Sequence, residues 1–335
     1  MAQAICKSNP IRERVRPCVP ADVGFLVPMR ELNPIDHPCV WRGNELLARE
    51  DWLHKVDTDS LEELAPVLSG IQASLEDGCG AAMLRGFRAA DDPRDAFLAI
   101  GQKIGTPISQ SAAGDLVFSV RDAGHKDDDP RARGPNTRKK LSYHSDRCDV
   151  IGFMCLNQAK SGGENYLVSS AAIYNQILES RPDLLEVLMQ PFYYLRHTVD
   201  TANEKPYCQQ PVFSFTDGKF ACNLLRVLIE RAHATSELPD LSDLQREALD
   251  YIAELADSPQ MHVSFMQQPG DILFLNNWVT LHRRSEFEDF PEEEKKRHIL
   301  RLWLSVPNSR PLDPLFLDNY GAVGAGEIRG GMRAG

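Results

Sequence analysis

The chain has 335 residues, of which 42% are hydrophobic and 25% are charged, as in ordinary globular proteins. Its formal net charge of -11 argues against binding to nucleic acid, which needs a basic surface. No stretch approaches the roughly 18 apolar residues of a membrane span, and the N-terminal segment MAQAICKSNPIRERVRP lacks the apolar core of a secretory signal.

The eight cysteines contain no CxxC pair, so neither a disulfide scaffold nor a zinc ribbon is indicated. We expect reduced thiols in a cytoplasmic protein that associates with neither membranes nor nucleic acid.

We expect three regions along the chain: an irregular N-terminal arm over 1–60, packed on the core; a single domain over 61–320; and a Gly-rich C-terminal tail over 321–335. Within the domain, 61–75 has the apolar spacing of a helix and 80–86 that of a short buried strand. A second helix should begin at Asp92-Pro93 and run to about Ile104. Residues 121–141 are charged and contain Gly and Pro, which predicts either a solvated loop or a lid over a substrate.

The second half of the chain alternates short strands with a few helices. Asp217-Gly218, flanked by apolar segments, predicts a hairpin over 212–222, and Ser242 should cap an amphipathic helix that ends near Ala256. Further strands are expected at 150–156, 261–266, 271–275 and 298–306, with a helix starting at Ser169 or Ser170. This inventory predicts a mainly β fold with flanking helices, a jelly roll of the cupin kind, better than an alternating α/β sheet.

Three side chains form a candidate metal site. His144 and Asp146 are two residues apart, so on an extended strand both would project to the same face. His282 follows the strand-like 271–275, and a turn there would present it to the first pair. Two histidines and a carboxylate form the facial triad of non-haem iron oxygenases, although three protein ligands plus water also describe a hydrolytic zinc site.

Two arginines favour the iron interpretation. If the strand expected near 298–306 includes residue 297, Arg297 and Arg301 would point into the barrel. The alternate positions His298, Leu300 and Leu302 would form the hydrophobic core face on the other side of the strand. Buried arginines are costly without an anionic partner, and the strand itself provides none. A dicarboxylate such as 2-oxoglutarate fits, since a guanidinium binds a carboxylate through two parallel hydrogen bonds.

Five segments resemble the taurine dioxygenase and clavaminate synthase-like (TauD/TfdA) family of iron(II)/2-oxoglutarate oxygenases: GAAMLRGF (80–87), SYHSD (142–146), KSGGENYLVSS (160–170), QPGDILFLNNWVTLHRRSEFED (268–289) and KRHILRLWL (296–304). They occur in the family order and span most of residues 60–306. The resemblance implies a double-stranded β-helix in which His144, Asp146 and His282 hold Fe(II).

The resemblance also implies the binding of 2-oxoglutarate. Arg297 would bind its distal carboxylate, and Arg301 its metal-bound carboxylate or the substrate, although the two roles can be exchanged. Many relatives have a threonine that hydrogen-bonds the distal carboxylate where this chain has Asn165, whose amide can donate the same bond.

The implied reaction consumes 2-oxoglutarate and O₂, releases succinate and CO₂, and oxidises a small metabolite, including those of secondary metabolism, by hydroxylation, desaturation or related C–H chemistry. Asp146 disfavours halogenation, because halogenases of this type lack the carboxylate ligand. Two alternatives stay open: a zinc-dependent hydrolase, and a non-catalytic cupin-like binding protein on the same barrel.

Four further residues have both a functional and a structural interpretation. Tyr143, Arg147 and Cys148 flank the metal ligands and either line the substrate pocket or pack in the core. Arg226 either contacts the substrate or lies on a helix surface.

Overall fold

The computed structural model describes residues 32–89, 92–124, 134–196 and 206–332. The chain divides into a unit of residues 1–33 and a unit of residues 34–335, and the second unit contains the helices and strands described below. The central part of the predicted loop or lid, residues 125–133, lies outside the described residues.

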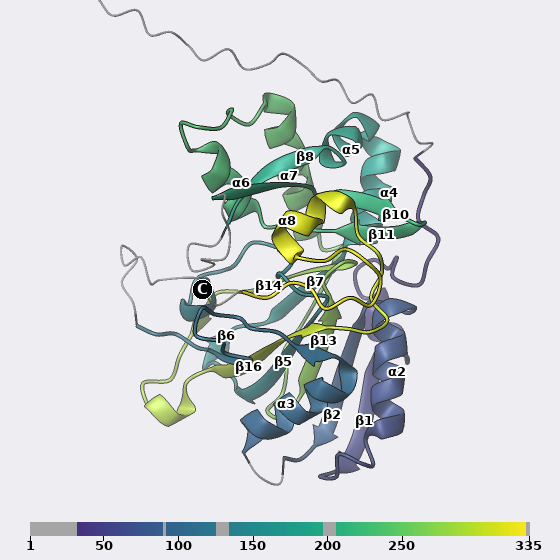
Figure 1. Ribbon diagram of the computed structural model, residues 1–335. Coiled ribbons are helices and arrows are strands. Elements are labelled where there is room, and N and C mark those ends of the chain that lie inside the picture. Colours follow the sequence, from purple (N-terminus) through teal and green to yellow (C-terminus); the bar gives the residue numbers. More distant parts are fainter. Residues whose placement is uncertain (1–31, 90–91, 125–133, 197–205, 333–335) are drawn as a thin grey trace, which may run out of the picture. The chain divides into compact units, whose positions relative to one another are not determined.

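The core of the second unit is a seven-stranded sheet (Figure 1). Its order is β1 (Leu53–Thr58), β2 (Ala81–Phe87), β13 (Ile272–Asn276), β5 (Val150–Asn157), β16 (His298–Ser305) and β3 (Thr106–Pro107), and β4 (Val117–Val120) also pairs with β16. All pairs are antiparallel except β1 with β2. The strands predicted at 80–86, 150–156, 271–275 and 298–306 are confirmed to within a residue or two.

Part of the segment expected to be an irregular arm is ordered structure. Residues 34–60 include the short helix α1 (Glu45–Ala48) and strand β1, which extends the large sheet by pairing with β2. Strand β1 has the sequence LHKVDT and is only partly buried, so it lacks the clear apolar alternation by which a strand is recognised.

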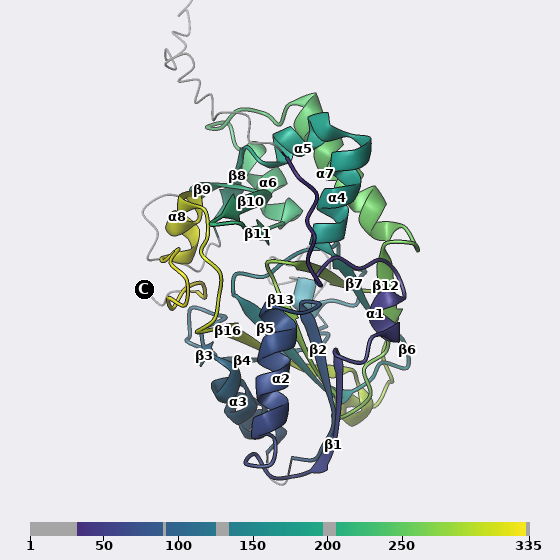
Figure 2. The same cartoon turned by 90° about the vertical axis from the view of Figure 1, so that its right-hand side faces the viewer.

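Two helices cover one face of the large sheet (Figure 2). They are α2 (Ala65–Glu76) and α3 (Pro93–Ile104), both predicted from the sequence. The side chain of Asp92 accepts a hydrogen bond from the backbone N–H of Arg94 and so caps α3. Ile71 of α2 and Phe97 of α3 pack with Leu302 of β16 in one hydrophobic cluster, which fixes the orientation of β16.

A smaller sheet packs against the other face of the large sheet. It has the order β12 (His262–Phe265), β7 (Asn165–Ser169) and β14 (Thr280–Arg284). Leu167 of β7 and Val263 of β12 share a buried cluster with Leu273 of β13 and Trp303 of β16. The interior between the two sheets is therefore lined by side chains of both sheets.

The remaining elements form three short strand pairs and several helices. The pairs are β6 (Ser161–Gly162) with β15 (Phe287–Glu288), β8 (Pro191–Leu195) with β9 (Tyr207–Pro211), and β10 (Phe213–Thr216) with β11 (Lys219–Cys222). The helices are α4 (Ser170–Ser180), α5 (Pro182–Leu188), α6 (Arg226–His233), α7 (Asp243–Asp257) and α8 (Leu317–Tyr320), with short 3₁₀ turns at Gly134–Asn136, Glu293–Lys295 and Pro314–Phe316.

Two local predictions in this part are confirmed by their backbone geometry. Asp217 and Gly218 have φ of 49° and 76°, the left-handed conformations that a tight hairpin turn requires. Ser242 and Gln245 form a reciprocal capping box at the start of α7.

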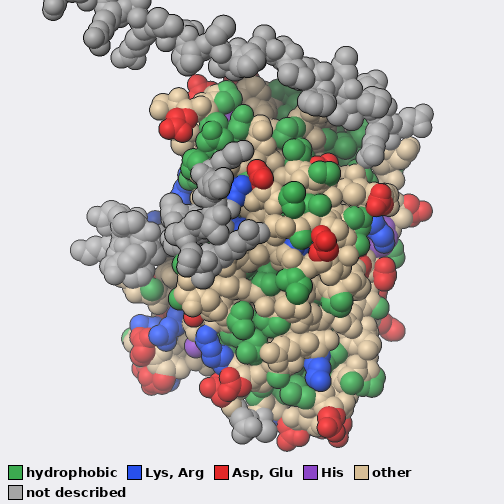
Figure 3. Space-filling view, viewed as in Figure 1, with side chains coloured by type: hydrophobic (Ala, Val, Ile, Leu, Met, Phe, Trp, Pro, Cys, Tyr) green, Lys and Arg blue, Asp and Glu red, His purple; other side chains and the backbone are tan. Residues whose placement is uncertain are grey.

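The residues expected to form a Gly-rich tail, as far as Met332, pack onto the domain. The side chain of Arg329 is buried, and the backbone N–H of Met332 donates to the carbonyl of Ser109. The six cysteines in the described part of the chain are free and buried, as expected for reduced thiols. Within the same residues, no helix is both long and apolar enough to cross a membrane. Basic and acidic side chains are interspersed on the face shown in Figure 3, without a broad basic patch.

Candidate active site

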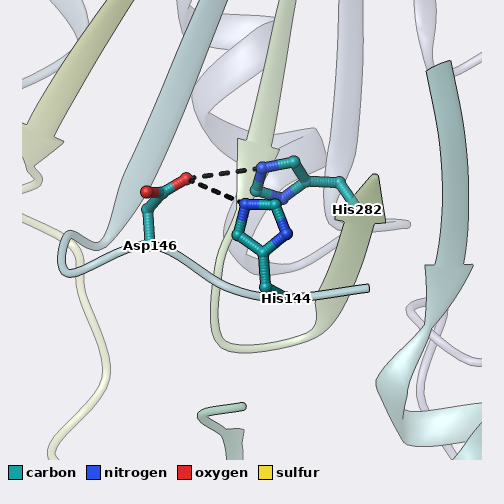
Figure 4. Close-up of side chains that lie close together, drawn as sticks. All are labelled: His144, Asp146 and His282. Carbon is teal, nitrogen blue, oxygen red and sulfur yellow. Dashed lines mark ion pairs between the residues drawn. The ribbon is translucent and has the colours of Figure 1, made fainter. Parts of the chain in front are cut away.

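His144, Asp146 and His282 meet between the two sheets (Figure 4). One ligand atom from each residue lies within 4.8 Å of the other two. The Nε2 atoms of His282 and His144 are 3.4 Å and 3.9 Å from the same carboxylate oxygen, Oδ2 of Asp146. The sequence prediction that these three side chains converge is confirmed.

The backbone that positions the triad differs from the prediction. His144 forms a single antiparallel bridge with His282 through two backbone hydrogen bonds, and Asp146 follows in a loop before β5. The prediction that the pair lies on a strand was therefore wrong, and His282 lies inside β14 and not on a turn after a strand. The side chain of Asn277 fixes the loop, since its Oδ1 accepts the backbone N–H of Asp146 at 3.1 Å.

The protonation of the triad suits a divalent metal. Burial, together with the nearby His282, lowers the pKa of His144 to about 4, so its imidazole is neutral at pH 7. Its Nδ1 lies 2.8 Å from the carbonyl of Ser142, a contact that assigns the proton to Nδ1 and leaves Nε2 as the free lone pair. Burial opposes ionisation of Asp146, but Arg301 and the two histidines outweigh it and hold its pKa below the usual range.

These residues fit a metal ion in their donor chemistry. Oδ2 of Asp146 is buried and has no hydrogen-bond partner among the described residues, although two imidazole nitrogens face it. A buried carboxylate oxygen without a partner is unfavourable unless a cation occupies the space it faces. Two imidazoles and one carboxylate on one side of that space form the 2-His-1-carboxylate arrangement.

Arg301 lies beside this centre. Its Nη1 is 3.5 Å from Oδ1 of Asp146, and its guanidinium lies near the rings of Trp303 and Phe118. Gln110 fixes the side chain, because its Oε1 accepts a hydrogen bond from Nε of Arg301 at 2.7 Å. Sequence analysis did not identify Gln110, which lies far from the arginine along the chain.

Arg297 is buried away from the triad. Its side chain is 6% exposed, and its Nη1 has no hydrogen-bond partner among the described residues. Burial lowers the pKa of Arg297 to about 10, although Cys155 and Asp289 partly offset that effect. A cationic side chain held in this way can accept an anionic ligand. Arg301 of β16 and Arg297, the residue before β16, are thus both buried, as predicted, while Leu300 and Leu302 of β16 pack in the core on the face opposite to Arg301.

Asn165, expected near the distal carboxylate, lies at the start of β7 and donates from Nδ2 to Oε1 of Gln267 at 3.0 Å. Gln267 is itself fixed, since its Nε2 donates to the carbonyls of Phe153 and Asp271. One of the two N–H donors of the Asn165 amide is therefore engaged within the protein.

The other candidate residues lie in structural contacts. The ring of Tyr143 lies beside Arg283 on the face of β14 opposite to His282, and its hydroxyl is buried. Cys148 is buried, its Sγ accepts Nδ2 of Asn277, and burial raises its thiol pKa. The backbone carbonyl of Arg147 accepts the N–H of Gly331 at 2.9 Å.

Arg226 lies at the start of α6. Its guanidinium pairs with Glu230 and with Asp250 of α7, both at 2.7 Å. These contacts agree with the interpretation as a helix-surface arginine.

Comparison with known proteins decides the family. Residues 45–303 match the model of the taurine catabolism dioxygenase TauD, TfdA family. The chain belongs to this family. Its members use iron and 2-oxoglutarate, so the protein is a non-haem iron dioxygenase, and the zinc hydrolase and the non-catalytic binding protein are set aside.

Curated relatives and solved structures agree with this assignment. FR-33289 synthase from Streptomyces rubellomurinus is 32% identical over 260 residues, which cover 75% of this chain and 76% of the relative. The taurine hydroxylase-like protein SAT17 from Stachybotrys chartarum is 34% identical over 193 residues, or 54% of this chain and 49% of that protein.

The fold is also that of solved oxygenases. Asparagine oxygenase (AsnO) aligns with a TM-score of 0.59 at 16% identity, over 83% of this chain and all of that one. The non-haem iron oxygenase OrfP, solved with Fe and α-ketoglutaric acid, aligns with a TM-score of 0.53 at 15% identity, over 73% and 80% of the two chains. The predicted jelly roll with flanking helices is confirmed.

Proposed function

We propose that this dioxygenase oxidises a C–H bond of a small metabolite, with His144, Asp146 and His282 as the iron ligands and Arg297 as the anchor of 2-oxoglutarate. The observation that carries the proposal is the convergence of two imidazole nitrogens on a buried carboxylate oxygen that has no hydrogen-bond partner in the described part of the chain. Bound iron supplies the redox chemistry that couples decarboxylation of 2-oxoglutarate by O₂ to oxidation of the substrate.

The protein prepares the ligands before the metal binds. The carbonyl of Ser142 orients the ring of His144, and the bridge between His144 and His282 fixes the separation of the two histidines. Arg301 keeps Asp146 ionised, which favours binding of a divalent cation.

The positions of the two arginines support a defined direction for 2-oxoglutarate. Arg301 lies within 3.5 Å of Asp146 and so belongs to the metal end of the pocket. Arg297 instead approaches Gly163 and the ring of Phe287. We therefore assign the distal carboxylate to Arg297, and the metal-bound carboxylate or the substrate to Arg301.

The substrate of this reaction is a small metabolite, and the outcome is hydroxylation, desaturation or a related C–H oxidation. The relatives named above support a small-molecule substrate. We do not assign Tyr143, Cys148 or Arg226 to substrate binding, because the first two are buried and Arg226 is paired with Asp250.

Turnover of the wild-type enzyme tests the class of reaction. Enzyme loaded anaerobically with Fe(II) should form succinate in proportion to added 2-oxoglutarate, and the metabolite from a panel that most stimulates succinate formation identifies the substrate group. Enzyme loaded with Zn(II) is the control. Succinate formation that does not depend on iron would contradict the proposal.

Asp146→Ala should abolish coupled turnover and weaken Fe(II) binding by about tenfold or more, because it removes the only anionic ligand of the triad. Fe(II) affinity is measured by anaerobic titration. Unchanged affinity would exclude Asp146 as a ligand.

Arg297→Ala should chiefly raise the 2-oxoglutarate concentration required for half-maximal turnover, by about 10- to 100-fold, because it removes charge-assisted hydrogen bonds to the distal carboxylate. Fe(II) affinity should change little, since Arg297 is not a member of the triad. An unchanged 2-oxoglutarate requirement would exclude the assigned role.

A further inference from the structure

A further buried arginine, Arg284, lies in the interior beside the proposed 2-oxoglutarate pocket. It is the second residue after His282 on β14, so both side chains project to the same face of the strand. The side chain is 5% exposed. Its Nε and Nη2 donate to the carbonyls of Ser285 and Lys139, and its Nη1 is buried without a hydrogen-bond partner among the described residues.

The strand register places Arg284 at the distal end of the pocket. Arg284 of β14 lies directly opposite Asn165 of β7, and paired residues on antiparallel strands share one face of the sheet. The guanidinium carbon of Arg284 is 4.5 Å from the centre of the Phe287 ring, and that of Arg297 is 5.2 Å from the same ring. Both guanidinium groups thus contact one side chain.

The charges around the two arginines do not balance. Among the described residues, the carboxylates of Asp122 and Asp289 act electrostatically on Arg284. Asp122 forms an ion pair with Arg138 at 3.0 Å, and Asp289 accepts the backbone N–H of Arg297. Over the described part of the chain, two buried guanidinium groups therefore share one carboxylate, which leaves an excess of one positive charge.

We propose that Arg284 is a second anchor for the distal carboxylate of 2-oxoglutarate, and that it acts together with Arg297. The inference rests on the proposed function, because it places 2-oxoglutarate in this pocket. Each arginine has a buried Nη1 for which the described residues provide no hydrogen-bond partner, and one carboxylate can accept both. Arg284 also provides a charged donor, whereas Asn165 is a neutral amide with one of its two N–H groups bound to Gln267.

The test compares two ligands that differ only at the distal end. Calorimetric titration under anaerobic conditions measures binding of 2-oxoglutarate and of 2-oxopentanoate, which has the same chain length but no distal carboxylate, to the Fe(II) enzyme. Arg284→Gln should weaken 2-oxoglutarate binding by about 10- to 100-fold, the usual effect of losing a hydrogen bond to a charged group. Binding of 2-oxopentanoate should stay within about twofold of wild type, since its interactions are at the metal end.

The neighbouring arginine is the matched control. Arg283 projects to the opposite face of β14, where its guanidinium lies over the Tyr166 ring at 3.8 Å and bonds to Asp257. Arg283→Gln removes the same charge from the same strand and should leave the ratio of the two affinities unchanged. Arg284→Lys keeps the charge without the planar fork and should give an intermediate loss of 2-oxoglutarate affinity.

Each result distinguishes the anchor from a purely structural arginine. Equal weakening of both ligands by Arg284→Gln, or an unchanged affinity for 2-oxoglutarate, would overturn the role of Arg284. If Arg284→Gln does not fold, Arg284→Lys provides the same comparison. A wild-type enzyme that binds both ligands equally well would instead overturn the proposed co-substrate pocket, and the second anchor with it.

Discussion

Asp149 connects the loop that carries Asp146 to distant parts of the chain. Its side chain is 1% exposed, and its Oδ1 accepts hydrogen bonds from Trp278 Nε1 at 2.9 Å and from Arg329 Nε at 2.7 Å. The other oxygen, Oδ2, accepts the backbone N–H of Val306 at 3.1 Å. Both carboxylate oxygens of this buried ion pair thus accept hydrogen bonds. Such a fully hydrogen-bonded pair favours one arrangement of the surrounding backbone.

Removal of this carboxylate should destabilise the protein strongly. Asp149→Asn leaves the guanidinium of Arg329 buried without its counter-charge, for which we expect a loss of about 3–5 kcal/mol in the free energy of unfolding. Asp51→Asn is the exposed control: Asp51 and Arg49 form an ion pair in which both side chains are partly exposed, and its loss should cost about 0–1 kcal/mol. Urea denaturation measures both, and equal effects would show that burial does not determine the strength of the pair.

Single residues differ in how well the sequence predicts their roles. The burial of Arg297 and Arg301 is predictable because the alternate residues of the same segment form an apolar face. A guanidinium group buried in this way requires an anionic partner. Arg284 follows a histidine and another arginine, and nothing local shows which of the two adjacent arginines faces inward. The pairing of Asp149 with Arg329 depends on the tertiary fold, because the two residues are far apart in the sequence.

Among the elements, strand β16 has two faces with different roles: one packs in the hydrophobic core, and the other faces the metal centre. Leu302 is fully buried against α2 and α3, whereas Arg301, one residue earlier, faces the metal centre. We expect Leu302→Ala to lower the free energy of unfolding by about 2–5 kcal/mol through loss of buried apolar contacts. The 2-oxoglutarate affinity of the folded fraction should change by less than about threefold, since the mutation removes no hydrogen bond to the ligand.

The two measurements on Leu302→Ala are thermal unfolding and anaerobic titration with 2-oxoglutarate. Arg297→Ala is the opposite case, because a large loss of 2-oxoglutarate affinity is expected from this residue, which directly precedes β16. A loss of affinity in Leu302→Ala as large as that in Arg297→Ala would show that the two faces of β16 are not independent.

Elements with strong local signals were predicted well, and those formed through distant partners were not. Helix α7 has a capping box, and the hairpin of β10 and β11 has a turn that requires φ above zero. The alternation of β16 is likewise contained in its own sequence. The bridge between His144 and His282 joins segments that are distant in the sequence. The convergence of His144 and Asp146 was therefore predicted, but the strand on which they were expected to lie was not found. Strand β1 depends in the same way on its parallel partner β2.

At the scale of the whole domain, residues 306–332 return to the loop that carries the metal ligands. The backbone N–H of Gly331 donates to the carbonyl of Arg147, the residue after Asp146, and Arg329 pairs with Asp149. The family match ends at residue 303, so this segment lies beyond it. The sequence predicted only a Gly-rich tail over 321–335, because the requirement for glycine comes from the surface on which the segment packs.

Gly330 allows this segment to approach the metal-binding loop closely. Its φ is +79°, and a Cβ at this position would lie 2.5 Å from the carbonyl oxygen of Arg147. Gly330→Ala must therefore displace either the segment or the loop that contains Asp146. We expect Fe(II) affinity to fall by about tenfold, the usual effect of disturbing the residues that orient a metal ligand, and the melting temperature to fall as well.

Gly114 provides a control that distinguishes the effect of the steric contact at Gly330 from the effect of the positive φ. Gly114 has a similar φ of +85°, but a Cβ there would meet nothing within 4 Å. Gly114→Ala therefore carries only the cost of a left-handed alanine, about 1–2 kcal/mol, and should leave Fe(II) affinity unchanged. If anaerobic titration shows the same Fe(II) affinity for both variants, the C-terminal segment stabilises the domain without positioning Asp146. A loss confined to Gly330→Ala makes this segment part of the structure that orients the metal ligands.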